Sequence, residues 1–269
     1  SFSGPVLMAD ALGRSLNVPA VRVAEALGLE LLLERLRKLG FRSLDQPATH
    51  YGLGLTLGSG EVTLLELAQG YAALARGGRT CRAMVLAPRG TPEPPAQVFS
   101  PQVAYLIARA LARQQPRIEA FGPSNALMFD YPVSVKTGTS SDFRDNWALG
   151  FAGPYTVGVW VGNFEGSSLG GLSGARGAGP LFARVMERLV GEHGPRPTPP
   201  PPGVTEVTVC ATSGRLPGPT CPRHRTLFVD TATSPRTTCP WHRTLTLDRR
   251  NGLRAGPRCP ERFVVERPF

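Results

Sequence analysis

Val133-Ser-Val-Lys-Thr-Gly-Thr-Ser140 is the stretch that decides the fold of this 269-residue chain. Its β-branched residues recur at every second position. Side chains two positions apart share a face of a strand, so we predict a strand over residues 133–140. Lys136 adds an ammonium group, Thr137 and Thr139 add hydroxyls, and Gly138 leaves space where a ligand backbone could lie. A strand edge of this kind suits an extended peptide that ends in a carboxylate.

Two more strands and a helix follow this stretch. Residues 146–153 and 156–163 are rich in aromatic and β-branched side chains, and Gly153-Pro154 between them is typical of a turn. Residues 179–192 carry apolar residues at helical spacing along one face. Three antiparallel strands followed by a helix with one apolar face predict an α+β fold, with helices packed against an antiparallel sheet.

The N-terminal half of the chain has mainly helical patterns. Residues 19–39 carry apolar residues at the spacing of two amphipathic helices. Thr63-Leu-Leu-Glu66 is a capping box that opens a further helix, and Ser100 opens one that we expect to stop before Pro116. The glycine-rich segment at residues 51–60 does not have the spacing of a phosphate-binding loop, so we predict a plain loop there.

Ser15-Leu-Asn17 lies between a helix predicted at residues 4–14 and the pair of helices predicted at residues 19–39. As a simple helix junction, Ser15 closes the first helix and Asn17 or Val18 caps the second. The same loop can present a hydroxyl and an amide to a cleft, and the two roles are compatible because a functional loop must also be capped. Ser15 and Asn17 are therefore candidate site residues.

A proline-rich segment at residues 195–203 predicts a stiff linker. We therefore divide the chain into a domain of residues 1–194, the linker, and a small, mostly β domain of residues 204–269. The small domain has 11 Arg against 5 acidic residues, and the whole chain carries a net charge of +10. This charge favours an anionic partner, which could be a carboxylate-rich polymer, a lipid surface or nucleic acid.

Four of the five cysteines lie in the small domain, and two explanations are open for them. Cys221-Pro-Arg-His224 recurs as Cys239-Pro-Trp-His242, and two Cys-x-x-His pairs can form a Cys2His2 zinc site. The other explanation is that the four cysteines form two disulfides in an exported domain.

Several motifs together resemble the transpeptidase domain of the class A, or bifunctional, penicillin-binding proteins. The residues that carry this resemblance are Ser15-x-Asn17, Gly60–Ala68, Lys136-Thr-Gly-Thr-Ser140, Arg144-Asp-x-Trp-Ala-x-Gly150 and Val159–Asn163. The tail, which has Ser213-Gly214 after Cys210 and the paired Cys-Pro elements at Cys221 and Cys239, is similar to the C-terminal domain of the penicillin-binding protein 1C branch. The resemblance implies the C-terminal part of the fold shared by serine β-lactamases and DD-transpeptidases.

This resemblance implies a peptidoglycan DD-transpeptidase that binds D-Ala-D-Ala stem peptides and β-lactams through a serine acyl-enzyme. The implied catalytic residues are Ser15, Asn17 and Lys136, and the implied substrate-binding residues are Thr137, Gly138 and Thr139. No cofactor and no metal are expected. A place in the periplasm, at the outer face of the cell membrane, favours two disulfides among Cys210, Cys221, Cys239 and Cys259, with Cys81 as a buried thiol.

The chain departs from the family at the nucleophile, because the Ser-x-x-Lys motif is absent. Arg35 stands three residues before Lys38, and Val133 stands three residues before Lys136. Family order places the motif ahead of Ser15. We therefore expect the nucleophile, the other strands, a membrane anchor and a glycosyltransferase domain to precede this chain, and the chain alone to be inactive.

Three other functions are compatible with the sequence. A non-catalytic penicillin sensor or scaffold could bind wall peptide, or another cell-wall or membrane partner through the Arg-rich tail. A β-lactamase-like enzyme would hydrolyse the acyl-enzyme, but the appended domain and the missing acidic loop signature argue against it. A zinc-dependent nucleic-acid binder would need the Cys2His2 site, and we expect no nucleic-acid partner.

Overall fold

The computed structural model describes residues 4–80, 82–84 and 94–268, so Cys81, which is predicted to be a buried thiol, lies outside the described residues. The chain forms two compact units. The larger unit comprises Met8–Pro202, and the smaller unit begins at Gly203 and includes the short segment that precedes Met8. No helix in the described part of the chain is long and apolar enough to cross a membrane.

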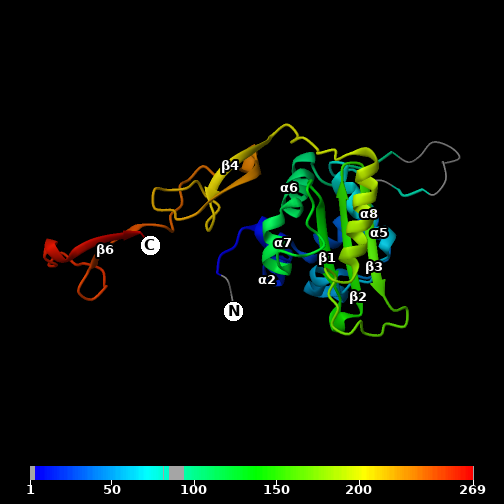
Figure 1. The fold of residues 1–269 in the computed structure, drawn as a ribbon, viewed down its shortest axis with the longest axis horizontal. Coiled ribbons are helices and arrows are strands. Elements are labelled where there is room, and N and C mark those ends of the chain that lie inside the picture. Colours follow the sequence, from blue (N-terminus) through cyan, green and yellow to red (C-terminus); the bar gives the residue numbers. More distant parts are fainter. Residues whose placement is uncertain (1–3, 81, 85–93, 269) are drawn as a thin grey trace. The chain divides into compact units, whose positions relative to one another are not determined.

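An antiparallel sheet of three strands forms the centre of the larger unit (Figure 1). The strands are β1 (Ser134–Thr139), β2 (Asp145–Ala152) and β3 (Tyr155–Gly162), in the order β1-β2-β3. Ala152 pairs with Tyr155, which leaves Gly153 and Pro154 as a two-residue hairpin loop. Gly153 has a φ of +55°, as the first residue of such a loop requires. The predicted strand and hairpin are confirmed within one residue at each end.

Helices cover both faces of this sheet. The long helix α8 packs on one face against β2 and β3, while α5 and α6 pack on the other (Figure 1). The α-helices of the larger unit are α1 (Met8–Gly13), α2 (Asn17–Leu27), α3 (Leu29–Lys38), α4 (Ala48–Tyr51), α5 (Leu64–Ala75), α6 (Pro101–Ala112), α7 (Gln114–Phe121) and α8 (Ala178–His193). The fold is α+β, as predicted.

The main hydrophobic core lies between the sheet and α8. Phe182 and Met186 of α8 are fully buried there, against valines of β1 and β3 such as Val135 and Val159. Gly150 of β2 is also required at this contact. A Cβ at this position would stand 2.3 Å from the Ser134 carbonyl oxygen. Close packing of this kind fixes where β1 lies relative to the rest of the unit.

The helical predictions are partly confirmed. Thr63 and Glu66 form the predicted capping box at the start of α5, and Glu66 also accepts hydrogen bonds from Ser43. Residues 19–39 divide into α2 and α3 at Gly28, which has a φ of +88°. Two predictions are corrected. A 3-10 helix at Gly52–Leu57 replaces most of the predicted loop, and the helix predicted at residues 4–14 begins only at Met8. The predicted end of a helix before Pro116 is confirmed, because α6 ends at Ala112.

The smaller unit consists of two separate hairpin-like strand pairs. Its strands are β4 (Val204–Cys210), β5 (His224–Asp230), β6 (Thr244–Asp248) and β7 (Val264–Pro268), paired as β4–β5 and β6–β7. Few side chains are buried in the described residues of this unit; they are Val209, Cys210, Cys221, Cys239 and Asp248. The described part of this unit therefore has no extensive hydrophobic core of its own.

Candidate functional site

The candidate site is built on β1, which carries the lysine-bearing motif. Among the described residues, β1 pairs with β2 alone, so the backbone groups along its other edge have no strand partner. The Ser134 hydroxyl donates to the Ala108 carbonyl of α6 at 2.9 Å, which ties the start of β1 to that helix. A strand edge with unpaired N–H and C=O groups can add an extended peptide as a further strand.

Lys136 of β1 and Ser15 meet directly, although 121 residues separate them in the sequence. The Lys136 ammonium donates to Ser15 Oγ at 2.7 Å and to the Thr137 carbonyl at 2.7 Å. No carboxylate among the described residues forms an ion pair with Lys136. Burial lowers the pKa of Lys136 to about 8, because the half-buried ammonium loses part of its hydration.

Close packing and ion pairs position the turn that carries Ser15. A Cβ at Gly13, near the end of α1, would stand 2.7 Å from Pro116 Cβ of α7, so only glycine allows these two elements to approach so closely. Asp10 of α1 also forms an ion pair with Arg113, which lies between α6 and α7. Because α6 is in turn held to β1, the turn is fixed relative to Lys136.

The backbone at Ser15 is in the left-handed region, with a φ of +59°. This conformation is unfavourable for a residue other than glycine, and residues of this kind cluster at functional sites. Asn17 begins α2 two residues later and is exposed. Leu16, not the predicted Asn17 or Val18, is the N-cap residue, and it forms no side-chain capping bond. The Asn17 amide is therefore not used as a helix cap.

Thr139 and Gly138 lie at the end of β1 beside a loop that the sequence patterns did not single out. The Thr139 hydroxyl accepts a hydrogen bond from the Gly174 N–H at 2.9 Å and can still donate its own proton. A Cβ at Gly174 would stand only 2.3 Å from the Gly138 carbonyl oxygen. A Cβ at Gly138 itself would make ordinary contact with Trp147, at 3.5 Å. The site thus depends on Gly174 for close packing.

The connection between β1 and β2 is closed by polar contacts. The Ser140 hydroxyl donates to Asp145 Oδ2 at 2.9 Å, and the Asp145 N–H donates to the Ser140 oxygen at 2.8 Å. The indole N–H of Trp160 on β3 donates to the other Asp145 oxygen at 2.9 Å. These contacts hold the end of β1 in a defined position relative to β2 and β3.

The cysteines of the smaller unit differ from the predicted disulfides. Cys210, Cys221, Cys239 and Cys259 are all free thiols in the structure. The first three lie together with His242, and Cys259 is not part of that group. The alternative Cys2His2 set is also not brought together as predicted, because the exposed His224 is outside the group.

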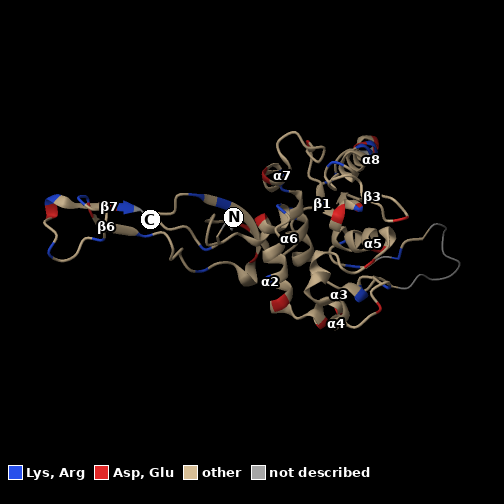
Figure 2. Cartoon of the chain, turned by 90° about the horizontal axis from the view of Figure 1, so that it is seen from below, with Lys and Arg blue, Asp and Glu red and all other residues tan. Residues whose placement is uncertain are grey.

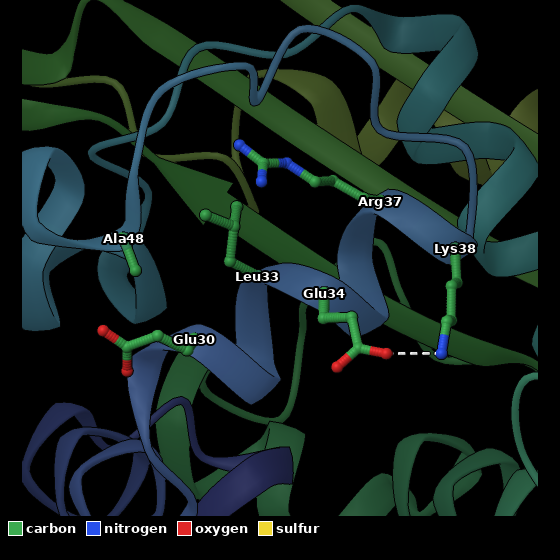
Figure 3. Close-up of a pocket in the computed structure, with 6 residues that line it drawn as sticks. All are labelled: Glu30, Leu33, Glu34, Arg37, Lys38 and Ala48. Carbon is green, nitrogen blue, oxygen red and sulfur yellow. Dashed lines mark hydrogen bonds and ion pairs between the residues drawn. The ribbon is translucent and has the colours of Figure 1, made fainter.

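A shallow pocket lies elsewhere in the larger unit and does not coincide with the Ser15–Lys136 site. Its volume is about 420 Å³, and Figure 3 shows its lining residues, which come mainly from α3. The Lys38 ammonium and the Glu34 carboxylate form an ion pair at this pocket. None of its lining residues carries a hydroxyl or thiol, so the pocket lacks a group like the Ser15 hydroxyl.

Comparisons with protein families match both units. The family described as the penicillin binding protein transpeptidase domain matches residues 1–187. The family described as the C-terminal domain of penicillin-binding protein 1A matches residues 200–244. We predicted a tail of the 1C type, and the family that matches it is described by the 1A name.

The individual relatives that match this chain are also penicillin-binding proteins. Penicillin-binding protein 1C of Escherichia coli K12 is 33% identical over 215 residues, which cover 80% of this chain and 27% of the relative. Penicillin-binding protein 1A of Aquifex aeolicus is 32% identical and covers 68% of this chain and 26% of the relative. The chain therefore spans about a quarter of the length of these relatives.

Solved structures support the fold. The 2.6 Å crystal structure of penicillin-binding protein 1A from Haemophilus influenzae matches with a TM-score of 0.73 at 22% identity, over 89% of this chain and 42% of that chain. PonA1 of Mycobacterium tuberculosis in complex with penicillin V matches with a TM-score of 0.54 at 20% identity, over 72% of this chain and 58% of that chain.

Proposed function

The chain belongs to the transpeptidase-domain family of the class A penicillin-binding proteins, and we propose that it supplies one side of the active site of a peptidoglycan DD-transpeptidase. The observation that carries this proposal is the 2.7 Å contact between Lys136 Nζ and Ser15 Oγ. It joins the Ser-x-Asn turn to the Lys-Thr-Gly strand, and these are two of the three motifs that this chemistry requires.

The substrate of this proposal is the D-Ala-D-Ala end of a stem peptide, lying along the free edge of β1. Its terminal carboxylate is attracted by the Lys136 ammonium, which has no carboxylate partner among the described residues. The hydroxyls of Thr137 and Thr139 donate hydrogen bonds to the same carboxylate. A β-lactam occupies this position because it mimics the D-Ala-D-Ala end.

The reaction in this proposal has two steps, which are acylation of a serine and transfer of the acyl group to a second amine. A serine hydroxyl attacks the carbonyl of the penultimate D-Ala, a serine ester forms, and the bond to the terminal D-Ala breaks. Ser15 passes a proton to the departing amine, and the Lys136 ammonium stabilises negative charge that develops on Ser15 Oγ. Asn17 orients the substrate amide. The amine of a second stem peptide then takes the acyl group and releases the serine.

The attacking serine of this mechanism belongs to a Ser-x-x-Lys motif, and neither lysine of the chain has a serine three residues before it. We assign this motif to the longer protein rather than to residues 1–269. The backbone N–H of that serine and the N–H of Thr139 then form the oxyanion hole. In this proposal the isolated chain is inactive and the assembled protein is active.

Fluorescent penicillin labelling of the longer protein tests the proposal. We expect covalent labelling of the wild type, and a fall in the labelling rate of at least about 100-fold in Lys136→Ala, by analogy with the loss of other groups that stabilise charge in a transition state. Lys38→Ala is the matched control, since Lys38 is the only other lysine and pairs with Glu34 on an exposed helix face.

The outcomes separate the proposal from its rivals. No labelling of the wild type would favour a non-catalytic sensor or scaffold. Labelling followed by rapid release of hydrolysed penicillin would favour a β-lactamase-like enzyme. Equal labelling of Lys136→Ala and Lys38→Ala would remove Lys136 from the mechanism. Thermal unfolding of each variant shows whether a loss of labelling reflects a loss of folding.

The proposed location is the outer face of the cell membrane, where peptidoglycan is assembled. Arginine recurs along the strands and loops of the smaller unit, and acidic residues are fewer there (Figure 2). An anionic wall polymer or lipid surface is the partner that this charge suits best. Binding of this kind should weaken as the ionic strength rises.

A further inference from the structure

Three cysteines and one histidine converge in the smaller unit. His242 Nδ1 lies 3.4 Å from Cys210 Sγ, 3.4 Å from Cys221 Sγ and 3.3 Å from Cys239 Sγ. All four of these atoms lie within 4.8 Å of one another. The three cysteines are buried, so the cluster is an enclosed site and not a chance grouping on the surface.

The distances fit a tetrahedral metal ion. Zn²⁺ binds thiolate sulfur at about 2.3 Å and imidazole nitrogen at about 2.0–2.1 Å. In a tetrahedron these bonds place a sulfur and a nitrogen about 3.6 Å apart. The observed separations of 3.3–3.4 Å are slightly shorter and need only a small expansion. Three thiolates and one imidazole are a donor set typical of structural zinc.

Two backbone segments bring the ligands together. Cys210 ends β4, and Cys221 follows in the loop before β5. The segment that contains Cys239 pairs with this loop, because the Cys239 N–H donates to the Leu216 carbonyl at 2.8 Å and the Leu216 N–H donates to the Thr237 carbonyl at 3.1 Å. The ligands therefore come from two loops that the backbone itself holds side by side.

Further hydrogen bonds support the ligands. The Gly218 N–H donates to Cys221 Sγ at 3.3 Å, and the Thr220 hydroxyl donates to the His242 carbonyl at 2.7 Å. N–H groups directed at sulfur stabilise a thiolate, and such outer contacts orient the ligands of metal sites. A cluster of neutral thiols would gain little from this arrangement.

A pair of disulfides does not account for the same cluster. Only two of the three clustered sulfurs can be joined, and the third would need Cys259. Cys259 is partly exposed and its sulfur lies near the Pro260 carbonyl, outside the cluster. The position of His242 at nearly equal distances from three sulfurs would also have no purpose in a disulfide domain.

We propose that Cys210, Cys221, Cys239 and His242 bind one structural Zn²⁺ ion in a closed Cys3His site. The site replaces the hydrophobic core that the described part of the smaller unit lacks. It differs from the Cys2His2 set that the repeated Cys-x-x-His motif suggests, because Cys210 takes the place of His224. The ion has a structural role and does not take part in the transpeptidase chemistry.

Elemental analysis of the 269-residue chain, purified with its thiols reduced, tests the proposal. We expect one zinc per chain, and loss of stoichiometric zinc in Cys210→Ser and His242→Ala. The matched controls are Cys259→Ser and His224→Ala, which change the same residue types outside the cluster and should keep one zinc per chain. Retention of zinc by Cys210→Ser together with its loss from His224→Ala would overturn the assignment in favour of Cys2His2.

Cobalt substitution gives a readout that does not depend on the folding of any variant. The wild-type chain loaded with Co²⁺ should show thiolate-to-cobalt charge transfer and the intense visible bands of tetrahedral cobalt. Absence of these bands would overturn the proposal. The mass of the chain purified without reductant gives a second check. A metal-free chain that is lighter than the reduced chain by four hydrogens, two for each of two disulfides, would also overturn the proposal.

Discussion

The two units of this chain are stabilised in different ways. In the larger unit, a continuous apolar core between the sheet and α8 buries side chains as large as Phe182 and Met186. In the described part of the smaller unit, the buried cluster consists of three cysteines. A large unit can bury enough apolar surface to fold, whereas a unit below about 80 residues commonly needs a metal or disulfides. This difference predicts that different treatments unfold the two units.

Metal removal should give the largest effect and should act on one unit alone. Binding of structural zinc contributes on the order of 10 kcal/mol to small zinc domains at neutral pH. A strong chelator should therefore abolish hydrogen-exchange protection in β4 and β5 while β1–β3 and α8 keep theirs. Cys259→Ser should respond as the wild type does. Hydrogen-exchange protection of β4 and β5 in the metal-free, reduced chain would contradict the prediction that the smaller unit depends on the metal.

Phe182→Ala should destabilise the larger unit and leave the smaller unit unchanged. Phe182 is fully buried in the core between α8 and the sheet, and loss of a buried phenylalanine costs about 3–5 kcal/mol of unfolding free energy. Urea unfolding followed by amide exchange should show this loss in the larger unit, with β4 and β5 unchanged. Phe164→Ala is the control, because Phe164 is 97% exposed and should change stability by less than about 0.5 kcal/mol.

Lys136→Met should have the smallest effect on the free energy of unfolding, and it should stabilise the larger unit where Phe182→Ala destabilises it. The folded-state pKa of Lys136 is about 8, below the ordinary value of 10.5. The unfolded chain therefore binds more protons between these values, and wild-type stability rises as the pH rises through this range. Removing the half-buried cation should stabilise the larger unit by about 1–2 kcal/mol at pH 7 and abolish this rise.

Urea titrations of wild type and Lys136→Met at pH 7 and pH 10 measure the effect. The difference between the two proteins isolates Lys136 from the other groups that titrate in this range. A variant that is less stable than the wild type at pH 7 would show that the ammonium stabilises the fold, and the site would then lack the unneutralised charge that we assign to it.

Local patterns in the sequence predicted the parts of the fold that depend on near neighbours. The alternation in β1–β3, the capping box of α5 and the apolar face of α8 are all visible in the sequence. The end of α6 at Ala112, ahead of Pro116, was also predicted from the sequence.

Both candidate sites are formed by residues that lie far apart in the sequence, and local sequence patterns alone did not predict these contacts. The pairing of Ser15 with Lys136 was expected from the resemblance to a family and not from spacing. Gly174 was missed because its close approach to β1 leaves no periodic signal. Cys210 was assigned to a disulfide because of the expected place in the periplasm, whereas the structure places its free thiol beside Cys221, Cys239 and His242.

The left-handed backbone at Ser15 limits how this position can change over time. Glycine, asparagine and aspartate tolerate that conformation, while alanine or a branched residue would add strain of roughly 1 kcal/mol or more. Replacement by glycine would keep the shape of the turn and delete only the hydroxyl. In the mechanism that we propose, Ser15→Gly therefore removes the proton relay and keeps the fold and the other ligand-binding groups, which makes this variant a natural choice for trapping a bound complex.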